Sequence, residues 1–170
     1  MLSVKQAAAV TAAAVAAAGV LATAPAASAA GAAVQGRPVV AENVRFFNED
    51  TNGALDASTF GPVAVTWEAN GGAFQDWLLH PSPRGYLIES VGRHGSCLQA
   101  PANPGDPIPV VKCNPNVPTQ QWAFNRVGDR VVIGEMLDEN YVIEATTTGN
   151  AVVKSFRDDN PRQLWDITPS

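Results

Sequence analysis

Few residues in this sequence have the chemistry that catalysis or metal binding requires. Its two histidines, His80 and His94, occur in turn-like stretches rich in Pro and Gly, and neither has a partner at a metal-ligand spacing. The carboxylates are scattered, and no phosphate-binding glycine loop or nucleophile elbow is present. We therefore expect solvated loop histidines, no enzyme activity, no metal and no cofactor.

The two cysteines, Cys97 and Cys113, are 16 residues apart. In an oxidising compartment, an even number of cysteines at a short spacing favours a disulfide. Closing a loop of this length would stabilise the fold by roughly 3 kcal/mol. Two free thiols are the alternative.

The N-terminal segment indicates that compartment. Lys5 is the only charged residue before Arg37, and residues 7–24 consist entirely of Ala, Val, Leu, Gly and Thr. Pro25 would end a helix, and residues 27–29 read Ala-Ser-Ala, a small-x-small cleavage pattern. We predict a secretory signal over residues 1–29, a flexible segment over 30–40 and a secreted domain over 41–170. An uncleaved N-terminal anchor is the alternative.

The charge balance argues against two classes of partner. Without Lys5, the chain has 10 basic and 16 acidic residues, a net charge of −6 with no long run of either sign. Nucleic acids and anionic membrane surfaces are bound by clustered Lys and Arg, which this sequence lacks. We expect a monomer that binds neither nucleic acid nor membrane.

A repeat organises residues 41–170. Three Gln-x-Trp triplets place Trp77, Trp122 and Trp165 at intervals of 45 and 43 residues. A second marker, an aliphatic residue followed by a polar residue and Ala, precedes each triplet at 55–57, 98–100 and 143–145. Apolar and β-branched runs recur in the same order, with turn residues between them. Each repeat therefore predicts four short strands.

Three repeats of four strands predict an all-β fold. A propeller needs about four or more blades to close, so the number of repeats favours a β-trefoil with pseudo-threefold symmetry. The triplets, with Cys97 directly before the second marker, resemble the ricin-B-type β-trefoil lectin family over roughly residues 41–170. The resemblance implies that Trp77, Trp122 and Trp165 form a shared core. It also implies that Gln75, Gln120 and Gln163 tie down neighbouring backbone before they contact any ligand.

The same resemblance implies a shallow sugar pocket in each repeat. An acid position falls on Asp56, Gln99 and Glu144, and the Gln of each triplet contributes as well. A stacking position, two residues before the second cysteine, falls on Val65, Val111 and Val153. An Asn position falls on Phe74, Thr119 and Arg162. No repeat keeps the full pattern.

The first repeat keeps most of the pattern, through Asp56 and Gln75. Trp67 could supply the missing ring if the third strand bulges. The alternative follows from the cysteine positions, which fall on Ala54 and Trp67 in the first repeat and on Val142 and Ser155 in the third. Trp67 would then only fill the space of an absent disulfide.

Two functions remain open at this point. The first is weak, non-catalytic binding of a glycan or polysaccharide, because hydrogen bonds without a stacking ring gain little over water. The second is binding of an extracellular protein, for example as a protease inhibitor, through the Pro-rich loops at 81–84 and 101–109. Proline restricts the backbone of such loops and lowers the entropy cost of binding.

Overall fold

The computed structural model describes residues 43–147 and 151–170. The predicted signal at 1–29 and the predicted flexible segment at 30–40 lie outside the described residues. No helix in the described part of the chain is long and apolar enough to cross a membrane.

The described residues form twelve strands and three short 3-10 helices, in the order that the repeats predict. Each repeat consists of three strands, one 3-10 helix and a fourth strand that begins at the Trp of the triplet. The first repeat contains β1 (Asn43–Asn48), β2 (Ala54–Asp56), β3 (Val65–Trp67), η1 (Ala73–Gln75) and β4 (Trp77–Pro81). The second contains β5 (Tyr86–Ser90), β6 (Ser96–Leu98), β7 (Val110–Lys112), η2 (Pro118–Gln120) and β8 (Trp122–Val127). The third contains β9 (Arg130–Glu135), β10 (Tyr141–Glu144), β11 (Val153–Phe156), η3 (Pro161–Gln163) and β12 (Trp165–Pro169).

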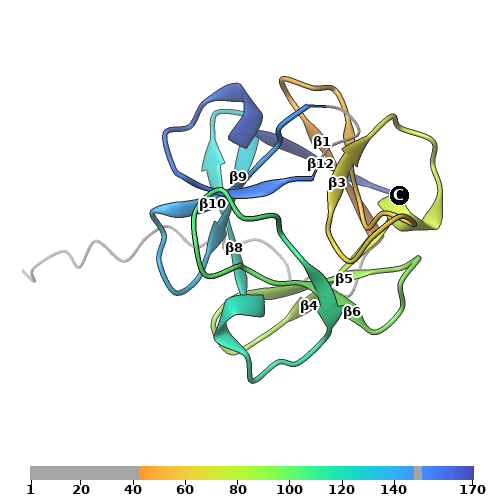
Figure 1. The fold of residues 1–170 in the computed structure, drawn as a ribbon. Helices are drawn as coiled ribbons and strands as arrows, with labels where there is room; N and C mark the ends of the chain where they lie inside the picture. Colours follow the sequence, from red (N-terminus) through yellow and green to blue (C-terminus); the bar gives the residue numbers. More distant parts are fainter. Residues whose placement is uncertain (1–42, 148–150) are drawn as a thin grey trace, which may run out of the picture. The chain divides into compact units, whose positions relative to one another are not determined.

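Six strands close into a barrel. Strand β1 pairs with β12 and β4, β5 pairs with β4 and β8, and β9 pairs with β8 and β12. The other six form three hairpins, β2–β3, β6–β7 and β10–β11, which are joined to one another by isolated bridges. Figure 1 shows the repeats as three lobes around a common centre. The predicted β-trefoil is confirmed.

The tryptophans of the three triplets lie in equivalent surroundings. Trp77, Trp122 and Trp165 are at most 1% exposed. Their indole N–H groups donate to the carbonyls of Leu55, Leu98 and Ile143, at 2.9, 3.1 and 3.3 Å. A buried indole needs such a partner, so one Trp per repeat fixes one barrel strand against one hairpin.

The glutamines of the triplets hold the loop that follows each hairpin. Gln75, Gln120 and Gln163 are at most 2% exposed. Their side-chain oxygens accept from the backbone N–H groups of residues 70, 114 and 158, while their amide nitrogens donate to the carbonyls of residues 68, 112 and 156. Each glutamine thus bridges two backbone groups that lie two residues apart, at the point where the third strand of its repeat ends.

The predicted disulfide between Cys97 and Cys113 is confirmed, with the two Cα atoms 4.9 Å apart. Cys97 lies within β6, whereas Cys113 lies one residue beyond the end of β7. The bridge therefore joins the hairpin of the second repeat to the turn that follows it.

Candidate functional site

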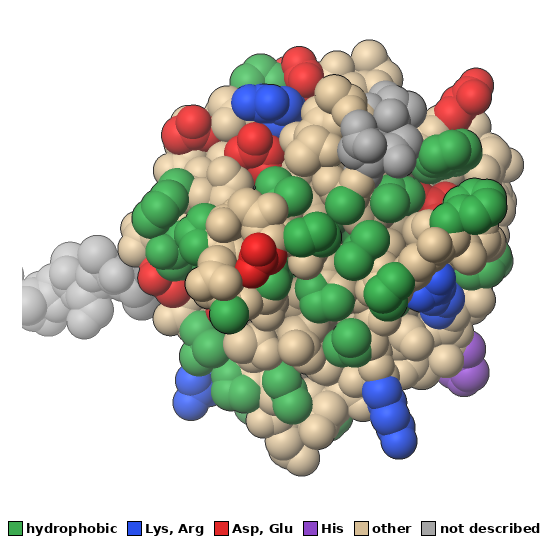
Figure 2. Space-filling model, viewed as in Figure 1, with side chains coloured by type: hydrophobic (Ala, Val, Ile, Leu, Met, Phe, Trp, Pro, Cys, Tyr) green, Lys and Arg blue, Asp and Glu red, His purple; other side chains and the backbone are tan. Residues whose placement is uncertain are grey.

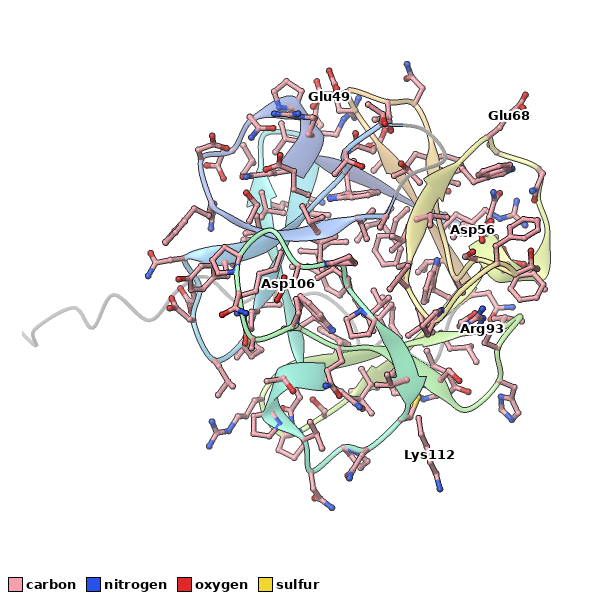
Figure 3. The ribbon with its side chains drawn as sticks, viewed as in Figure 1. Glu49, Asp56, Glu68, Arg93, Asp106 and Lys112 are labelled. Carbon is pink, nitrogen blue, oxygen red and sulfur yellow. A yellow bond between two sulfur atoms is a disulfide. The ribbon has the colours of Figure 1, made fainter. Side chains whose placement is uncertain are left out.

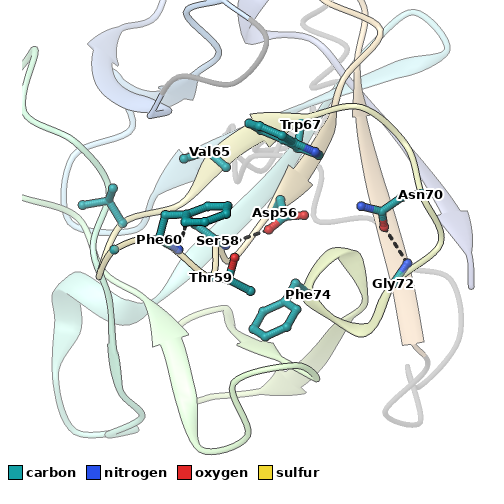
Figure 4. A pocket seen from close by; sticks show the side chains of 11 residues that line it. Asp56, Ser58, Thr59, Phe60, Val65, Trp67, Asn70, Gly72 and Phe74 are labelled. Carbon is teal, nitrogen blue, oxygen red and sulfur yellow. Dashed lines mark hydrogen bonds between the residues drawn. The ribbon is translucent and has the colours of Figure 1, made fainter.

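A pocket of about 550 Å³ opens on the first repeat. Its walls come from the β2–β3 hairpin, from the connection between these strands and from η1, as Figure 4 shows. Eleven residues line it: Asp56, Ser58, Thr59, Phe60, Gly61, Val63, Val65, Trp67, Asn70, Gly72 and Phe74. The sequence-predicted residues Asp56 and Trp67 therefore meet in one pocket.

The register of the hairpin explains why these two residues meet. Asp56 pairs with Val65, and Trp67 pairs with Ala54. Because side chains alternate across a strand, Asp56, Val65 and Trp67 share one face, and Trp67 is the diagonal neighbour of Asp56. The opposite face carries Leu55 and Thr66, which are fully buried.

Asp56 presents one carboxylate oxygen to the pocket. The residue is only 7% exposed, and its Oδ1 accepts from the backbone N–H of Ser58 at 2.7 Å. Within the described residues, its other oxygen has no hydrogen bond. Asp56 is also the only charged side chain among the described residues that line the pocket. It is therefore placed to accept a charge-assisted hydrogen bond from a ligand hydroxyl.

Trp67 supplies an open ring face beside that carboxylate. Its surface is 43% exposed, which distinguishes it from the three buried tryptophans. In the view of Figure 4, the carboxylate of Asp56 lies between the rings of Trp67 and Phe74. The arrangement combines one acceptor with flat apolar surfaces, which suits a ligand that has both hydroxyl groups and exposed C–H groups.

A loop of the second repeat holds the pocket in shape. Arg93, in the β5–β6 connection, donates through one guanidinium nitrogen to the carbonyls of Ser58 and Gly61. Figure 3 shows Arg93 and Asp56 on the same side of the domain. Its neighbour Gly92 donates to the Ala73 carbonyl at 2.8 Å, and a Cβ at Gly92 would lie 2.8 Å from the Phe74 nitrogen. Glycine at this position therefore allows the loop to pack directly against the Phe74 wall.

Gln75 is a predicted ligand contact that does not line the pocket. Its amide group is committed to the backbone of Glu68 and Asn70. Asn70 does line the pocket, so Gln75 shapes the site by fixing the chain on either side of Ala69.

The equivalent positions in the other repeats are engaged within the protein. In the second repeat, the Gln99 side-chain oxygen accepts from the Gln120 amide at 3.0 Å. In the third repeat, Glu144 accepts from the Gln163 amide at 2.8 Å and lies 3.6 Å from the Arg162 guanidinium. Each predicted acid position therefore contacts the glutamine of its own repeat, except in the first.

The structure corrects the sequence alignment of the stacking position. In the three hairpins, Leu55, Leu98 and Ile143 pair with Thr66, Val110 and Lys154. The residues that directly follow these partners are therefore equivalent: Trp67, Val111 and Ser155. Sequence alignment placed Val65 and Val153 there, two residues too early. No bulge in β3 is needed for Trp67 to present its ring.

The cysteine position shifts in the same way. The Gln75 and Gln163 amides donate to the carbonyls of Glu68 and Phe156, as the Gln120 amide does to Lys112. Ala69 and Arg157, the next residues, therefore correspond to Cys113, and Trp67 and Ser155 do not. The alignment that placed Trp67 at the position of the second cysteine is therefore wrong.

The sequence did not reveal Phe60, which lines the pocket, or Arg93, which binds the loop that carries Phe60. Phe60 lies in the connection between two strands, where no repeat marker draws attention to it. Arg93 acts on a loop of another repeat, and no local pattern reports such a contact. An aromatic residue within a turn-rich stretch, Ser-Thr-Phe-Gly-Pro at 58–62, was the one available signal for Phe60.

A separate polar cluster surrounds Glu89. His80 Nε2 lies 2.6 Å and His94 Nδ1 lies 2.8 Å from its carboxylate, and the Gly95 N–H donates to it at 2.7 Å. Burial alone would raise the pKa of Glu89, but the hydrogen bonds and the charges of the two histidines outweigh burial and lower it. The two histidines are thus paired with a carboxylate rather than only solvated. No group of three or more ligand-type side chains in the described residues could hold a metal ion.

Comparisons with known proteins agree with this fold. A model of the ricin-type beta-trefoil lectin domain matches residues 42–165. No curated protein matches the chain. A solved structure of the Macrolepiota procera ricin B-like lectin in complex with lactose is similar, with a TM-score of 0.64 and 19% identity over 79% of this chain and 100% of that one. The designed threefold-symmetric protein ThreeFoil has a TM-score of 0.64 and 16% identity over 75% of this chain and 99% of its own.

Other similar structures are much longer than this chain. An exo-beta-1,3-galactanase from Clostridium thermocellum has a TM-score of 0.66 and 19% identity over 76% of this chain, but only 30% of its own length is covered. The chain spans 16% of a mosquitocidal holotoxin that it matches with a TM-score of 0.68 and 13% identity over 76% of this chain. Identities this low indicate a shared fold.

Proposed function

The chain belongs to the ricin-type β-trefoil lectin domain family, and from this premise we propose that it is a secreted, non-catalytic protein that binds carbohydrate through the pocket of its first repeat. One observation carries the proposal. The Asp56 carboxylate and the exposed Trp67 indole share one face of the β2–β3 hairpin and line one pocket.

The chemistry of a sugar ring fits these two groups. The hydroxyl groups of a pyranose donate well to a carboxylate, and a hydrogen bond to a charged acceptor is stronger than one to a neutral acceptor. The C–H groups on one face of the same ring pack against an aromatic plane. The paired strands place both groups on one face before a ligand arrives, so little backbone ordering entropy is lost on binding.

We expect weak binding, because among the described residues only the first repeat has both a carboxylate and an aromatic ring available to a ligand. Val111 and Ser155 occupy the positions that correspond to Trp67, and Gln99 and Glu144 are hydrogen-bonded to glutamines of their own repeats. Without several sites of similar strength, the chain lacks the avidity that multivalent attachment supplies. We expect it to bind a single glycan chain with low affinity.

Secretion is supported by the sequence of residues 1–29. The single positive charge, the small apolar segment and the Ala-Ser-Ala pattern are typical of a cleaved signal. The disulfide between Cys97 and Cys113 is consistent with an oxidising compartment.

Glycan binding is tested directly with the purified, oxidised protein. We expect retardation in affinity electrophoresis through at least one neutral polysaccharide, and binding to a subset of neutral glycans on an array. Trp67→Ala should remove both signals, whereas Phe156→Ala, which changes an exposed aromatic residue of the third repeat, should leave them in place. Equal binding by the two variants, or no binding by the wild type at millimolar ligand, would contradict the proposal.

A second candidate function rests on the turn at residues 81–85. Gln121 accepts from the Ser82 hydroxyl and from the backbone N–H of Arg84, and the Ser82 N–H donates to the Gly85 carbonyl. The turn is therefore fixed, and it presents the exposed Arg84 to solvent. Such a pre-organised loop suits an extracellular protein partner. Arg84→Ala should weaken binding of such a partner and leave glycan binding intact.

A further inference from the structure

Phe60 is the most exposed large apolar residue among the described ones, with 91% of its surface accessible. It stands at the edge of the pocket, in the connection between β2 and β3. Exposed apolar groups at the edge of a concave site commonly mark a surface that a ligand covers. Phe60 therefore needs an explanation beyond folding.

The chain around Phe60 is held firmly on both sides. The Phe60 N–H donates to the Ser58 hydroxyl at 3.0 Å, and Arg93 binds the carbonyls of Ser58 and Gly61. Ser58 itself adopts a positive φ of 53°, which its hydrogen bond to Asp56 supports. Because the backbone is fixed, the aromatic ring can be covered at a small cost in loop entropy.

The position of Phe60 differs from that of the other two rings in the pocket. Trp67 and Phe74 are partly covered and flank the Asp56 carboxylate, whereas nearly all of the Phe60 ring is open to solvent. Such a ring does not enclose a sugar held at Asp56, but it can support the next unit along a chain. The cavity of about 550 Å³ offers room beyond one pyranose.

The charge of the site restricts the class of glycan. Asp56 is the one charged side chain among the described lining residues, and the Arg93 guanidinium binds backbone carbonyls behind the loop. Figure 2 shows hydrophobic side chains over the centre of the face drawn in Figure 1, with charged side chains mainly around its edge. A uronic, sialic or sulfated sugar would bring a negative charge close to Asp56 and be disfavoured.

We propose that Phe60 is the platform for a second sugar unit, so that the pocket binds a neutral glycan through two linked residues. This inference rests on the proposed function of the same pocket. In this arrangement, Asp56 and Trp67 bind one sugar unit and Phe60 contacts the next unit. The pocket would therefore bind a glycan chain more tightly than a single sugar.

The test compares each monosaccharide with its own disaccharide. Galactose and lactose, glucose and cellobiose, and N-acetylglucosamine and chitobiose are titrated into the wild type, Phe60→Ala and the control Phe156→Ala. We expect the wild type to prefer one disaccharide over its monosaccharide, and Phe60→Ala to reduce that preference about tenfold, as loss of one aromatic contact implies. Phe156→Ala should keep the wild-type preference.

Failure of the inference and failure of the proposed function give different results. If the wild type binds a disaccharide and Phe60→Ala has the same disaccharide preference, Phe60 is not a platform, although the sugar site stands. If the wild type binds none of these sugars or the polysaccharides, the proposed function fails and the inference with it. Glucuronic acid that binds as tightly as glucose would overturn the restriction to neutral glycans.

Discussion

Asp56 and Trp67 lie diagonally across the β2–β3 hairpin. Asp56 of β2 pairs with Val65 of β3, and Trp67 lies two residues after Val65 in β3. This relationship is fixed by backbone pairing rather than by a flexible loop. The pairing therefore places the carboxylate and the ring on the same face of the hairpin in the absence of ligand.

Removing the ring should abolish most of the affinity for a sugar. We expect Trp67→Ala to weaken glycan binding at least about tenfold, because the aromatic plane supplies the main apolar contact. The free energy of unfolding should change by less than about 1 kcal/mol, since an exposed side chain contributes little to stability. Isothermal titration and urea denaturation measure the two quantities. A variant that loses stability but binds normally would contradict the assignment.

Removing the charge of Asp56 separates binding from loop structure. Asp56→Asn keeps an oxygen that can accept from the Ser58 N–H, but it loses the charge that strengthens a bond to a ligand hydroxyl. We expect affinity to fall by about tenfold, because charge-assisted hydrogen bonds are roughly twice as strong as neutral ones. Asp56→Ala should weaken binding further, since it also frees the loop that carries Phe60. Similar affinities for Asp56→Asn and the wild type would show that the carboxylate is not used.

The repeat and the core could be predicted from sequence because each depends on a short local pattern. Every Gln-x-Trp triplet places an indole against a carbonyl of its own hairpin, 22 to 24 residues earlier in the chain. The identity of the stacking residue could not be predicted in the same way. The runs at 110–112 and 152–154 are alike in sequence, yet Val111 pairs with Cys97 whereas Ser155, and not Val153, pairs with Val142. An alignment of these runs therefore displaces the third strand by two residues.

Phe60 and Arg93 could not be inferred from any single repeat. Arg93 belongs to the β5–β6 connection and binds the loop of the preceding repeat. Such contacts between loops depend on how the three repeats pack around the barrel. The acidic residue of the site, Asp56, could therefore be predicted from the sequence. The loop that completes the site could be recognised only from the structure.

The disulfide should stabilise the fold without affecting the pocket. Replacing Cys97 and Cys113 together by Ser is expected to lower the free energy of unfolding by about 3 kcal/mol, from the loop of this length. Glycan affinity under folding conditions should not change, because neither cysteine lines the pocket. Chemical denaturation followed by titration checks both expectations. A clear loss of affinity in the folded variant would contradict this expectation and show that the bridge also supports the pocket.

Acid should remove the contribution of Glu89 to stability. Its pKa lies below the ordinary value of 4.5 in the folded protein, so folding favours the charged form. That stabilisation is present above pH 4.5 and is lost as the pH falls through the folded pKa. We expect the stability difference between the wild type and Glu89→Gln to shrink as the pH falls below 4.5, measured by urea denaturation. A difference that grows with acidity would contradict the assignment.

The indole N–H resonances of the four tryptophans test the central claim most directly. Three indoles are buried and bonded to backbone carbonyls, while the indole of Trp67 lies open in the pocket. In a heteronuclear NMR titration with a glycan that binds, the Trp67 resonance should shift progressively while those of Trp77, Trp122 and Trp165 stay in place. Binding that leaves the Trp67 resonance unmoved would show that the sugar site lies elsewhere on the molecule.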